Sequence, residues 1–171
     1  MKILILNGSP RPKGNTAMFA AAFRDGAESA GHQVDVVGVA KLKINGCLGC
    51  EYCHKAGAGK CIQKDDMQDV YPKLAEADVI VIASPIYYWS FSGQMQSFIT
   101  RFYAPGKPAA KKYAMILSSG SPDVYNAPIS QYKDILAYFG AEDLGIKTFN
   151  GPDQLSEENL AEVRAFGASI K

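Results

Sequence analysis

The chain has 171 residues, of which 47% are hydrophobic and 20% charged, and its formal net charge is +1. These values are typical of a soluble globular protein and predict one domain with a substantial core. The near-neutral charge leaves no electrostatic footprint for nucleic acid or an acidic membrane surface. The uncharged stretch 79–100 is split by Ser84-Pro85 and is too polar to span a membrane, and no secretory leader pattern precedes the first apolar run. We therefore expect a cytoplasmic protein.

The first sixteen residues predict a phosphate-binding site. Residues 2–7 form a short apolar run that indicates a strand, and a helical pattern begins at Thr16. The connection between them is rich in glycine, proline and hydroxyl groups. Free N–H groups and the dipole at the start of a helix attract phosphate. The side chains available to such a phosphate are Ser9, Arg11, Lys13, Asn15 and Thr16.

This connection differs from three well-known phosphate-binding loops. It lacks the G-x-x-x-x-G-K-[ST] spacing of ATP and GTP sites and the G-x-G-x-x-G dinucleotide fingerprint. No cysteine in the chain is followed six positions later by arginine, which excludes a cysteine phosphatase loop. The alternative is a solvated connection with Asn15 as an ordinary N-cap. The position and composition of the loop favour phosphate.

Apolar periodicity then predicts alternating elements along the chain. Continuous or β-branched apolar runs indicate further strands at 33–39, 78–83, 113–117 and 143–149. Helical spacing indicates helices at 16–30, 92–103 and 129–139, and a last helix capped by Ser156. Another helix opens at Asp65 and Asp66, where Asp65 and Gln68 fit a capping box, and Pro72 predicts a kink or a shifted start. Residues 84–91 are expected to form an aromatic-rich loop.

This alternation predicts a doubly wound α/β fold of three layers, with one parallel five-stranded sheet. The flavodoxin-like order 2-1-3-4-5 suits five strands and places a ligand where strands one and three end. The loops 8–16, 84–91 and 118–121 then meet at one edge of the sheet. We expect a single flavodoxin-like domain over 1–171, with a cysteine-rich loop at 41–64.

A phosphate loop beside an aromatic loop suggests FMN. We expect the flavin ring to lie against the loop that follows strand three and beside the end of strand four, with contacts from Ser84, Pro85, Ile86, Tyr87, Tyr88, Ser118, Ser119 and Gly120. Trp89 and Phe91 are expected at a subunit interface or a pocket wall. The alternative for these aromatic residues is packing in the core or at an interface.

Three motifs in order resemble the NADPH-dependent FMN reductase family. Each motif consists of two segments. The first is residues 7–11 and 14–16, the second is 46–50 and 64–67, and the third is 83–87 and 98–101. The resemblance implies a flavodoxin-like fold, bound FMN, NAD(P)H as electron donor, and a homodimer or homotetramer paired through the helix after strand three. It assigns Ser9, Arg11, Asn15 and Thr16 to the phosphate and Pro85, Ile86 and Tyr87 to the ring. Gln96 and Thr100 depart from it, because many members have Lys and Asp there.

The cysteines form a compact group in the run Cys47-x2-Cys50-x2-Cys53-x7-Cys61. C-x2-C-x2-C is a spacing of iron–sulfur proteins, whereas zinc sites more often use two separated C-x2-C pairs. The loop resembles that of the iron–sulfur flavoprotein branch of the same family, in which a [4Fe–4S] cluster passes electrons to FMN. Free thiols, a disulfide formed on oxidation and adventitious zinc are the alternatives.

These expectations describe an FMN-dependent oxidoreductase that passes electrons from NAD(P)H to a flavin, a quinone, another small molecule or a redox protein. FMN carries the chemistry, so no catalytic side chain is assigned. Two other classes stay open: an iron–sulfur electron carrier for a ferredoxin-like partner, and a non-redox protein that binds a phosphate ligand or a metal.

Overall fold

A computed structural model describes residues 1–104 and 108–171. Five parallel strands form a sheet in the order β2-β1-β3-β5-β6, which confirms the predicted 2-1-3-4-5 arrangement. A short strand, β4 (Ser90–Phe91), pairs antiparallel with the end of β3 and is the only addition within the described residues. The five parallel strands are β1 (Lys2–Asn7), β2 (Gln33–Gly38), β3 (Val79–Tyr87), β5 (Lys112–Ser119) and β6 (Glu142–Asn150).

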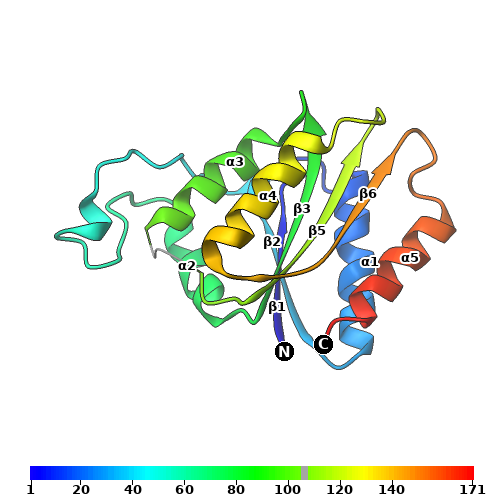
Figure 1. Ribbon diagram of the computed structural model, residues 1–171, viewed down its shortest axis with the longest axis horizontal. Coiled ribbons are helices and arrows are strands. Elements are labelled where there is room, and N and C mark those ends of the chain that lie inside the picture. The colour runs from blue at the N-terminus through cyan, green and yellow to red at the C-terminus, as the bar shows by residue number, and fades with distance from the viewer. Residues whose placement is uncertain (105–107) are drawn as a thin grey trace.

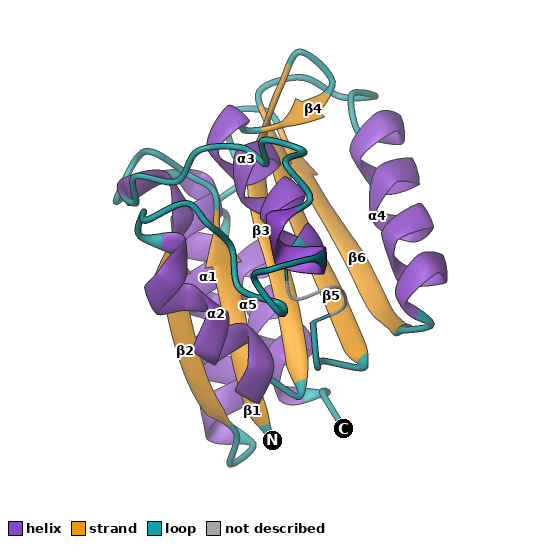
Figure 2. Ribbon diagram, turned by 90° about the vertical axis from the view of Figure 1, so that its left-hand side faces the viewer, coloured by secondary structure: helices purple, strands orange, loops and turns teal. Residues whose placement is uncertain are grey.

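Helices cover both faces of the sheet (Figure 1). One layer consists of α1 (Asn15–Ser29) and α5 (Glu157–Ala168), and the other of α2 (Met67–Glu76), α3 (Gly93–Thr100) and α4 (Asn126–Phe139). Single 3-10 turns lie at Val39–Lys41 (η1), Tyr52–His54 (η2) and Arg101–Tyr103 (η3). The segment between β2 and α2 reaches outward past α3 in Figure 1, and in Figure 2, which is viewed from that side, it lies in front of the sheet.

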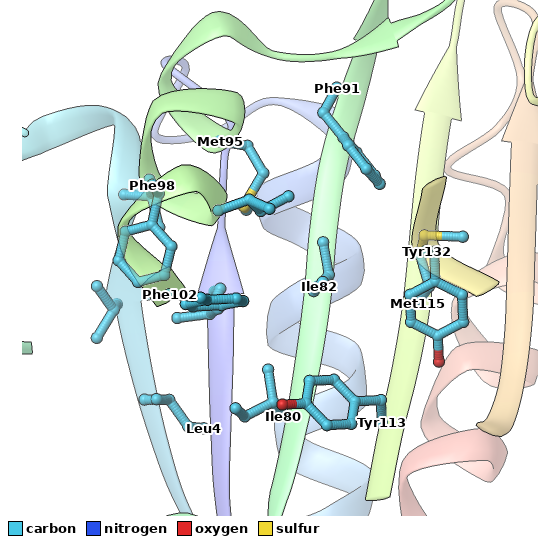
Figure 3. Packing of buried hydrophobic residues seen from close by; sticks show 14 of the residues in the cluster. Leu4, Ile80, Ile82, Phe91, Met95, Phe98, Phe102, Tyr113, Met115 and Tyr132 are labelled. Carbon is cyan, nitrogen blue, oxygen red and sulfur yellow. The ribbon is translucent and has the colours of Figure 1, made fainter. Parts of the chain in front are cut away.

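The sheet separates two hydrophobic clusters. Alternate side chains of β1, such as Ile3 and Leu4, point to opposite faces, so that a strand buried on both sides is apolar along its whole length. On the α3 side, Phe98 and Phe102 pack toward the strands (Figure 3). Phe91 also lies in this core, so the expectation of an interface or pocket-wall position for it is wrong.

Glycines bring α1 and α5 into close contact on the opposite face. A Cβ atom on Gly26 would overlap the backbone carbonyl of Arg164, and one on Gly167 would overlap that of Phe23. Since neither carbonyl is the free end of a flexible side chain, only glycine allows the two helices this separation. The rings of Phe23 and Phe166 meet edge to face beside this contact.

His32 joins the two ends of the described fold. The amino group of Met1 lies 3.4 Å from Nδ1 of His32, and Nε2 lies 3.0 Å from the carbonyl oxygen of Ile170. Because a carbonyl only accepts hydrogen bonds, Nε2 carries the ring proton and Nδ1 accepts from the amino group. The N- and C-terminal ends lie side by side at the amino-terminal edge of the sheet (Figure 1).

Two local predictions need correction. Residues 84–91 are not a loop, because β3 continues through Tyr87 and returns as β4. The capping box is wrong: the Asp65 carboxylate binds Arg101, and the Gln68 amide donates to the carbonyl of Gln63. α2 starts at Met67 and runs through Pro72 to Glu76. None of the described helices has the length and apolarity that crossing a bilayer requires.

Candidate functional site

An open cavity of about 470 Å³ lies at the carboxyl-terminal edge of the sheet. It is bounded by the carboxyl-terminal ends of β3 and β5 and by the connections that follow β1, β5 and β6, as expected where a doubly wound sheet binds its ligand. The residues that line it are Ser9, Arg11, Gly14, Asn15, Thr16, Pro85, Ile86, Tyr87, Ser118, Ser119, Gly120, Gly151, Pro152 and Gln154.

The loop after β1 is held in shape by its own short-range hydrogen bonds. The Ser9 amide donates to Oδ1 of Asn7 at 3.0 Å, and the Arg11 amide donates to Oγ of Ser9 at 3.2 Å. The Gly14 amide donates to the carbonyl of Arg11 at 3.1 Å. A Cβ atom on Gly14 would come within 3.2 Å of Oγ of Ser9, so glycine keeps this turn tight.

The start of α1 carries no side-chain cap. Its N-cap is Gly14, and no acidic residue lies in its first turn. The alternative in which Asn15 caps the helix is therefore wrong. Among the described residues that line the cavity, Arg11 is the only charged one. An uncapped helix start beside a single cation provides the donors and the positive potential that an anion needs.

Two hydroxyl groups meet at the floor of the cavity. Oγ1 of Thr16 and Oγ of Ser118 lie 2.6 Å apart, and both side chains are buried. This hydrogen bond connects the first turn of α1 to the end of β5. Each hydroxyl retains further hydrogen-bonding capacity, since a hydroxyl has one proton and two lone pairs.

The β3–β4 hairpin forms one wall of the cavity. Pro85, Ile86 and Tyr87 face the cavity, whereas Tyr88 and Trp89 at the tip line a neighbouring hollow. Both tip residues have positive φ angles, 49° and 58°, which are uncommon for aromatic residues. Two successive positive φ angles are what the two-residue turn between the paired residues Tyr87 and Ser90 requires, and Tyr88 is 94% exposed. Strain of this kind concentrates at functional sites.

The structure brings most of the predicted ligand-binding residues together. Lys13, Ser84 and Tyr88 are the ones that do not line the cavity. Lys13 is exposed outside it, and Ser84 is fully buried, where its hydroxyl accepts from the Ser92 amide at 3.1 Å. The cavity is lined by the predicted residues Ser9, Arg11, Asn15, Thr16, Pro85, Ile86, Tyr87, Ser118, Ser119 and Gly120.

Gln154 is a lining residue that the sequence analysis missed. Its side-chain amide donates to the carbonyls of Ser119 at 3.1 Å and Gly151 at 2.8 Å, which fixes the orientation of the group. Its Oε1 is buried and has no hydrogen-bond partner within the described structure. No local pattern marks Gln154, because it is buried only by the ends of β5 and β6.

The cysteine loop forms a separate feature beside α3. Cys47 and Cys50 are exposed, Cys61 is half-buried, and Cys53 is buried, which raises the pKa of its thiol through desolvation. All four line one small cavity together with Arg101 and Tyr103. Within 1–104 and 108–171, however, no three His, Cys, Asp or Glu side chains are already arranged to hold a metal ion.

Residues at the end of α3 hold this loop in place. Oγ1 of Thr100 accepts from the Cys47 amide at 3.0 Å, and the hydroxyl of Tyr103 donates to Glu51 at 2.6 Å. Thr100 thus supports the cysteine loop, although its position departs from the family resemblance noted in the sequence, where Asp is common. Gln96, the other departure, exchanges two 2.9 Å hydrogen bonds with Gln131 of α4.

A comparison with known protein families shows to which family this chain is related. The family described as NADPH-dependent FMN reductase matches residues 1–154, which include every predicted flavin-contacting residue. The chain belongs to the NADPH-dependent FMN reductase family.

Relatives of this FMN reductase family member include iron–sulfur flavoproteins. One from Archaeoglobus fulgidus is 32% identical over 99% of this chain and 79% of its own length. One from Methanocaldococcus jannaschii is 38% identical over 59% of this chain and 50% of its own, so the chain spans about half of some curated relatives. A solved NAD(P)H:quinone oxidoreductase from Methanothermobacter marburgensis shares the fold, with a TM-score of 0.83 and 19% identity. The match covers 100% of this chain and 99% of that protein.

The cleft of this family member fits FMN in its chemistry. A phosphate dianion suits the uncapped start of α1 and the Arg11 cation, which no acidic lining residue opposes within the described part of the chain. The unpartnered Oε1 of Gln154 requires a donor, which a ligand with hydroxyl or ring N–H groups supplies. The cysteine loop fits an iron–sulfur cluster in its donor set, because four thiols line one cavity. Within the described residues the thiols are not yet arranged to hold a metal, so cluster binding would require them to move closer together.

Proposed function

We propose that this chain is an FMN-dependent oxidoreductase that takes electrons from NAD(P)H and passes them to a small-molecule acceptor such as a flavin or a quinone. The observation that carries the proposal is the cavity at the carboxyl-terminal edge of the sheet. There the uncapped α1 helix and Arg11 face the aromatic β3–β4 hairpin across one open space.

The chain's own residues supply position and charge. Arg11 and the first amides of α1 would hold the phosphate, and Thr16, Ser118 and Gln154 would receive the polar chain of the cofactor. Pro85, Ile86 and Tyr87 would bound the ring. Bound FMN supplies hydride and electron transfer. No side chain of the cavity is required as an acid or a base, and the openness of the site leaves room for a donor and an acceptor to bind in turn.

An FMN titration with a matched pair of lysine and arginine variants tests this proposal. Arg11→Met removes the only charge among the described residues that line the cavity, whereas Lys13→Met removes an exposed charge from the same loop outside the cavity. Loss of a charge-assisted hydrogen bond of about 1.5–3 kcal/mol should weaken FMN binding about tenfold to a hundredfold in Arg11→Met only. Riboflavin, which lacks the phosphate, should bind both variants equally.

Activity is measured on the same samples. Oxidation of NADPH and of NADH with free flavin or a quinone as acceptor should depend on added FMN. A protein that binds neither FMN nor riboflavin would contradict the proposal and favour the non-redox alternative, a protein for a phosphate ligand or a metal.

A second candidate function rests on the cysteine loop. We propose that Cys47, Cys50, Cys53 and Cys61 bind a [4Fe–4S] cluster, which makes the protein an electron carrier for a redox partner such as a ferredoxin-like protein. The supporting observation is that four thiols from the loop between β2 and α2 line a single cavity. We further propose a homodimer or homotetramer, without nucleic-acid or membrane partners.

An absorbance spectrum of protein purified without oxygen separates the two candidates. Flavin bands alone, with turnover of NAD(P)H, support the reductase and count against the cluster. A broad shoulder that bleaches with dithionite and disappears in Cys50→Ser supports the cluster. Light scattering on the same sample gives the number of chains in the assembly.

A further inference from the structure

Arg101 is the most deeply buried charged side chain among the described residues, with 1% of its surface exposed. It lies in η3, directly after α3. Its guanidinium forms an ion pair with Asp65, with contacts of 2.6 and 3.1 Å to the two carboxylate oxygens. Burial opposes both charges, but their mutual hydrogen bonds outweigh this cost, so the pKa of Asp65 is lowered and that of Arg101 is raised.

The same guanidinium contacts both ends of the cysteine loop. Nη1 donates to the carbonyl of Asn45, just before the first cysteine, at 2.9 Å. Asp65 lies just after the last cysteine, and its carboxylate also accepts from the Asn45 amide at 3.1 Å. The two loop ends are therefore joined to each other and to the end of α3 through one side chain.

Arg101 also reaches a cysteine directly. Its Nη2 donates to Sγ of Cys61 at 3.3 Å, and its Nε is buried without a partner in the described structure. The contacts of the head group thus include both loop ends and one of the four thiol sulfurs. An ion pair that only stabilised the fold would require no contact with a sulfur atom.

We propose that Arg101 is the positioning residue of the cysteine loop: it fastens both loop ends to the end of α3 and holds a fixed positive charge against the sulfur of Cys61. The second part rests on the proposed iron–sulfur function. A cluster bound by thiolates is negatively charged and gains a further negative charge on reduction. Hydrogen bonds to its sulfurs and nearby charges therefore set its reduction potential.

Two single variants should shift this potential in opposite directions. Arg101→Met removes the positive charge and should lower the potential, making the reduced cluster about tenfold less favoured, equivalent to about 59 mV for a one-electron couple. Asp65→Asn removes the compensating negative charge with little change of shape and should raise the potential. Arg101→Lys keeps the charge and should stay closer to the wild type. A purely structural role predicts no such opposite signs.

Further variants protect the measurement from misfolding. Arg101→Met leaves the Asp65 carboxylate without its cationic partner. The double variant Arg101→Met with Asp65→Asn is therefore compared with the single variant Asp65→Asn, and the difference between these two potentials gives the effect of Arg101 alone. Arg24→Met, an exposed arginine on α1 that pairs with Asp25, is the control for loss of a distant charge. Potentials are read by a dye-mediated titration followed by electron paramagnetic resonance. Equal potentials in the wild type, Arg101→Met and the double variant would overturn the electrostatic role.

Hydrogen exchange on iron-free protein tests loop closure separately. Amides in 43–66 should exchange at least about tenfold faster in Arg101→Lys than in the wild type, while the strands of the sheet keep their protection. Unchanged exchange would overturn the fastening role. If wild-type protein takes up no cluster, the proposed iron–sulfur function and the electrostatic role of Arg101 both fail, and the exchange data alone decide loop closure.

Discussion

Buried polar atoms without partners mark both candidate sites. Within the described residues, three such side-chain atoms occur: Oε1 of Gln154 at the cleft, Nε of Arg101 at the cysteine loop, and the hydroxyl of Tyr113 in the core. Most buried polar groups in folded proteins are hydrogen-bonded, so each exception requires a reason. For Gln154 and Arg101, the reason that we propose is a ligand or a charge nearby.

Gln154→Leu should weaken FMN binding about threefold to tenfold, because a hydrogen bond contributes about 0.5–1.5 kcal/mol. The variant also loses two donors to backbone carbonyls, so urea unfolding is measured alongside the FMN titration. Gln33→Leu on the exposed surface of β2 is the control and should bind FMN like the wild type. Equal affinities in all three proteins would mean that Gln154 has no role in binding.

The Asp65–Arg101 pair predicts a loss of stability in acid. The pKa of folded Asp65 lies below its ordinary value of 3.8, so the pair stabilises the fold fully above that pH. This contribution is lost as the pH falls through the folded pKa. The free energy of unfolding in urea should decline below about pH 4 more steeply for the wild type than for Asp65→Asn. Parallel profiles would contradict the shift.

At the level of elements, the parallel strands were predictable and their extensions were not. Helices cover both faces of the sheet, so the side chains on both sides of β1, β3 and β5 are buried. This is why these strands are continuous apolar runs that the sequence alone reveals. β3 continues past the run because Pro85 and its neighbours pair with β5, although proline suggests that a strand ends. The hairpin at Tyr88 and Trp89 lacks the glycine or asparagine that usually signals such a turn.

Distant contacts explain the other failures. Asp65 and Gln68 have the spacing of a capping box, but Arg101, 36 residues away, takes the carboxylate. Gln154 follows a weak strand and becomes part of the cleft only when β5 and β6 are adjacent. The convergence of the loop after β1 and the end of β3 was predictable because strand ends in a doubly wound sheet meet at one edge. Local sequence does not specify which additional side chains join them.

The helix pair α1 and α5 should tolerate no side chain at its crossing. Gly26→Ala should destabilise the protein by about 1–3 kcal/mol, because the added methyl group overlaps the backbone of Arg164. Gly93→Ala, in the first turn of α3 with open space around its Cβ position, should be neutral or slightly stabilising. Chemical denaturation of both variants checks this pair of expectations, and equal midpoints would contradict the close contact.

At the scale of the whole molecule, the cleft connects the fold's stability to its ligand. Four strand ends contribute to the cavity, so a ligand bound there holds β1, β3, β5 and β6 together. FMN at a hundred times its Kd should stabilise the fold by about 2.7 kcal/mol. For a chain of this size, that raises the melting temperature by about 5–10 °C.

Thermal unfolding is followed with FMN, with riboflavin and without ligand. Riboflavin at the same concentration should give a smaller shift, because it lacks the phosphate that the start of α1 and Arg11 would bind. Identical shifts for the two ligands would show that the phosphate contributes nothing to binding.

The position of His32 between the two chain ends makes a circular permutation of the chain feasible. Because its imidazole bonds to Met1 and to the carbonyl of Ile170, a short glycine-serine linker could join the two ends without crossing the cleft. New ends could then be opened between Ala56 and Gly57 in the cysteine loop, away from the sheet. Such a circular permutant should keep its flavin pocket while cutting the backbone between Cys53 and Cys61. One rearranged chain would thus separate flavin binding from the proposed iron–sulfur function without altering a residue of either site.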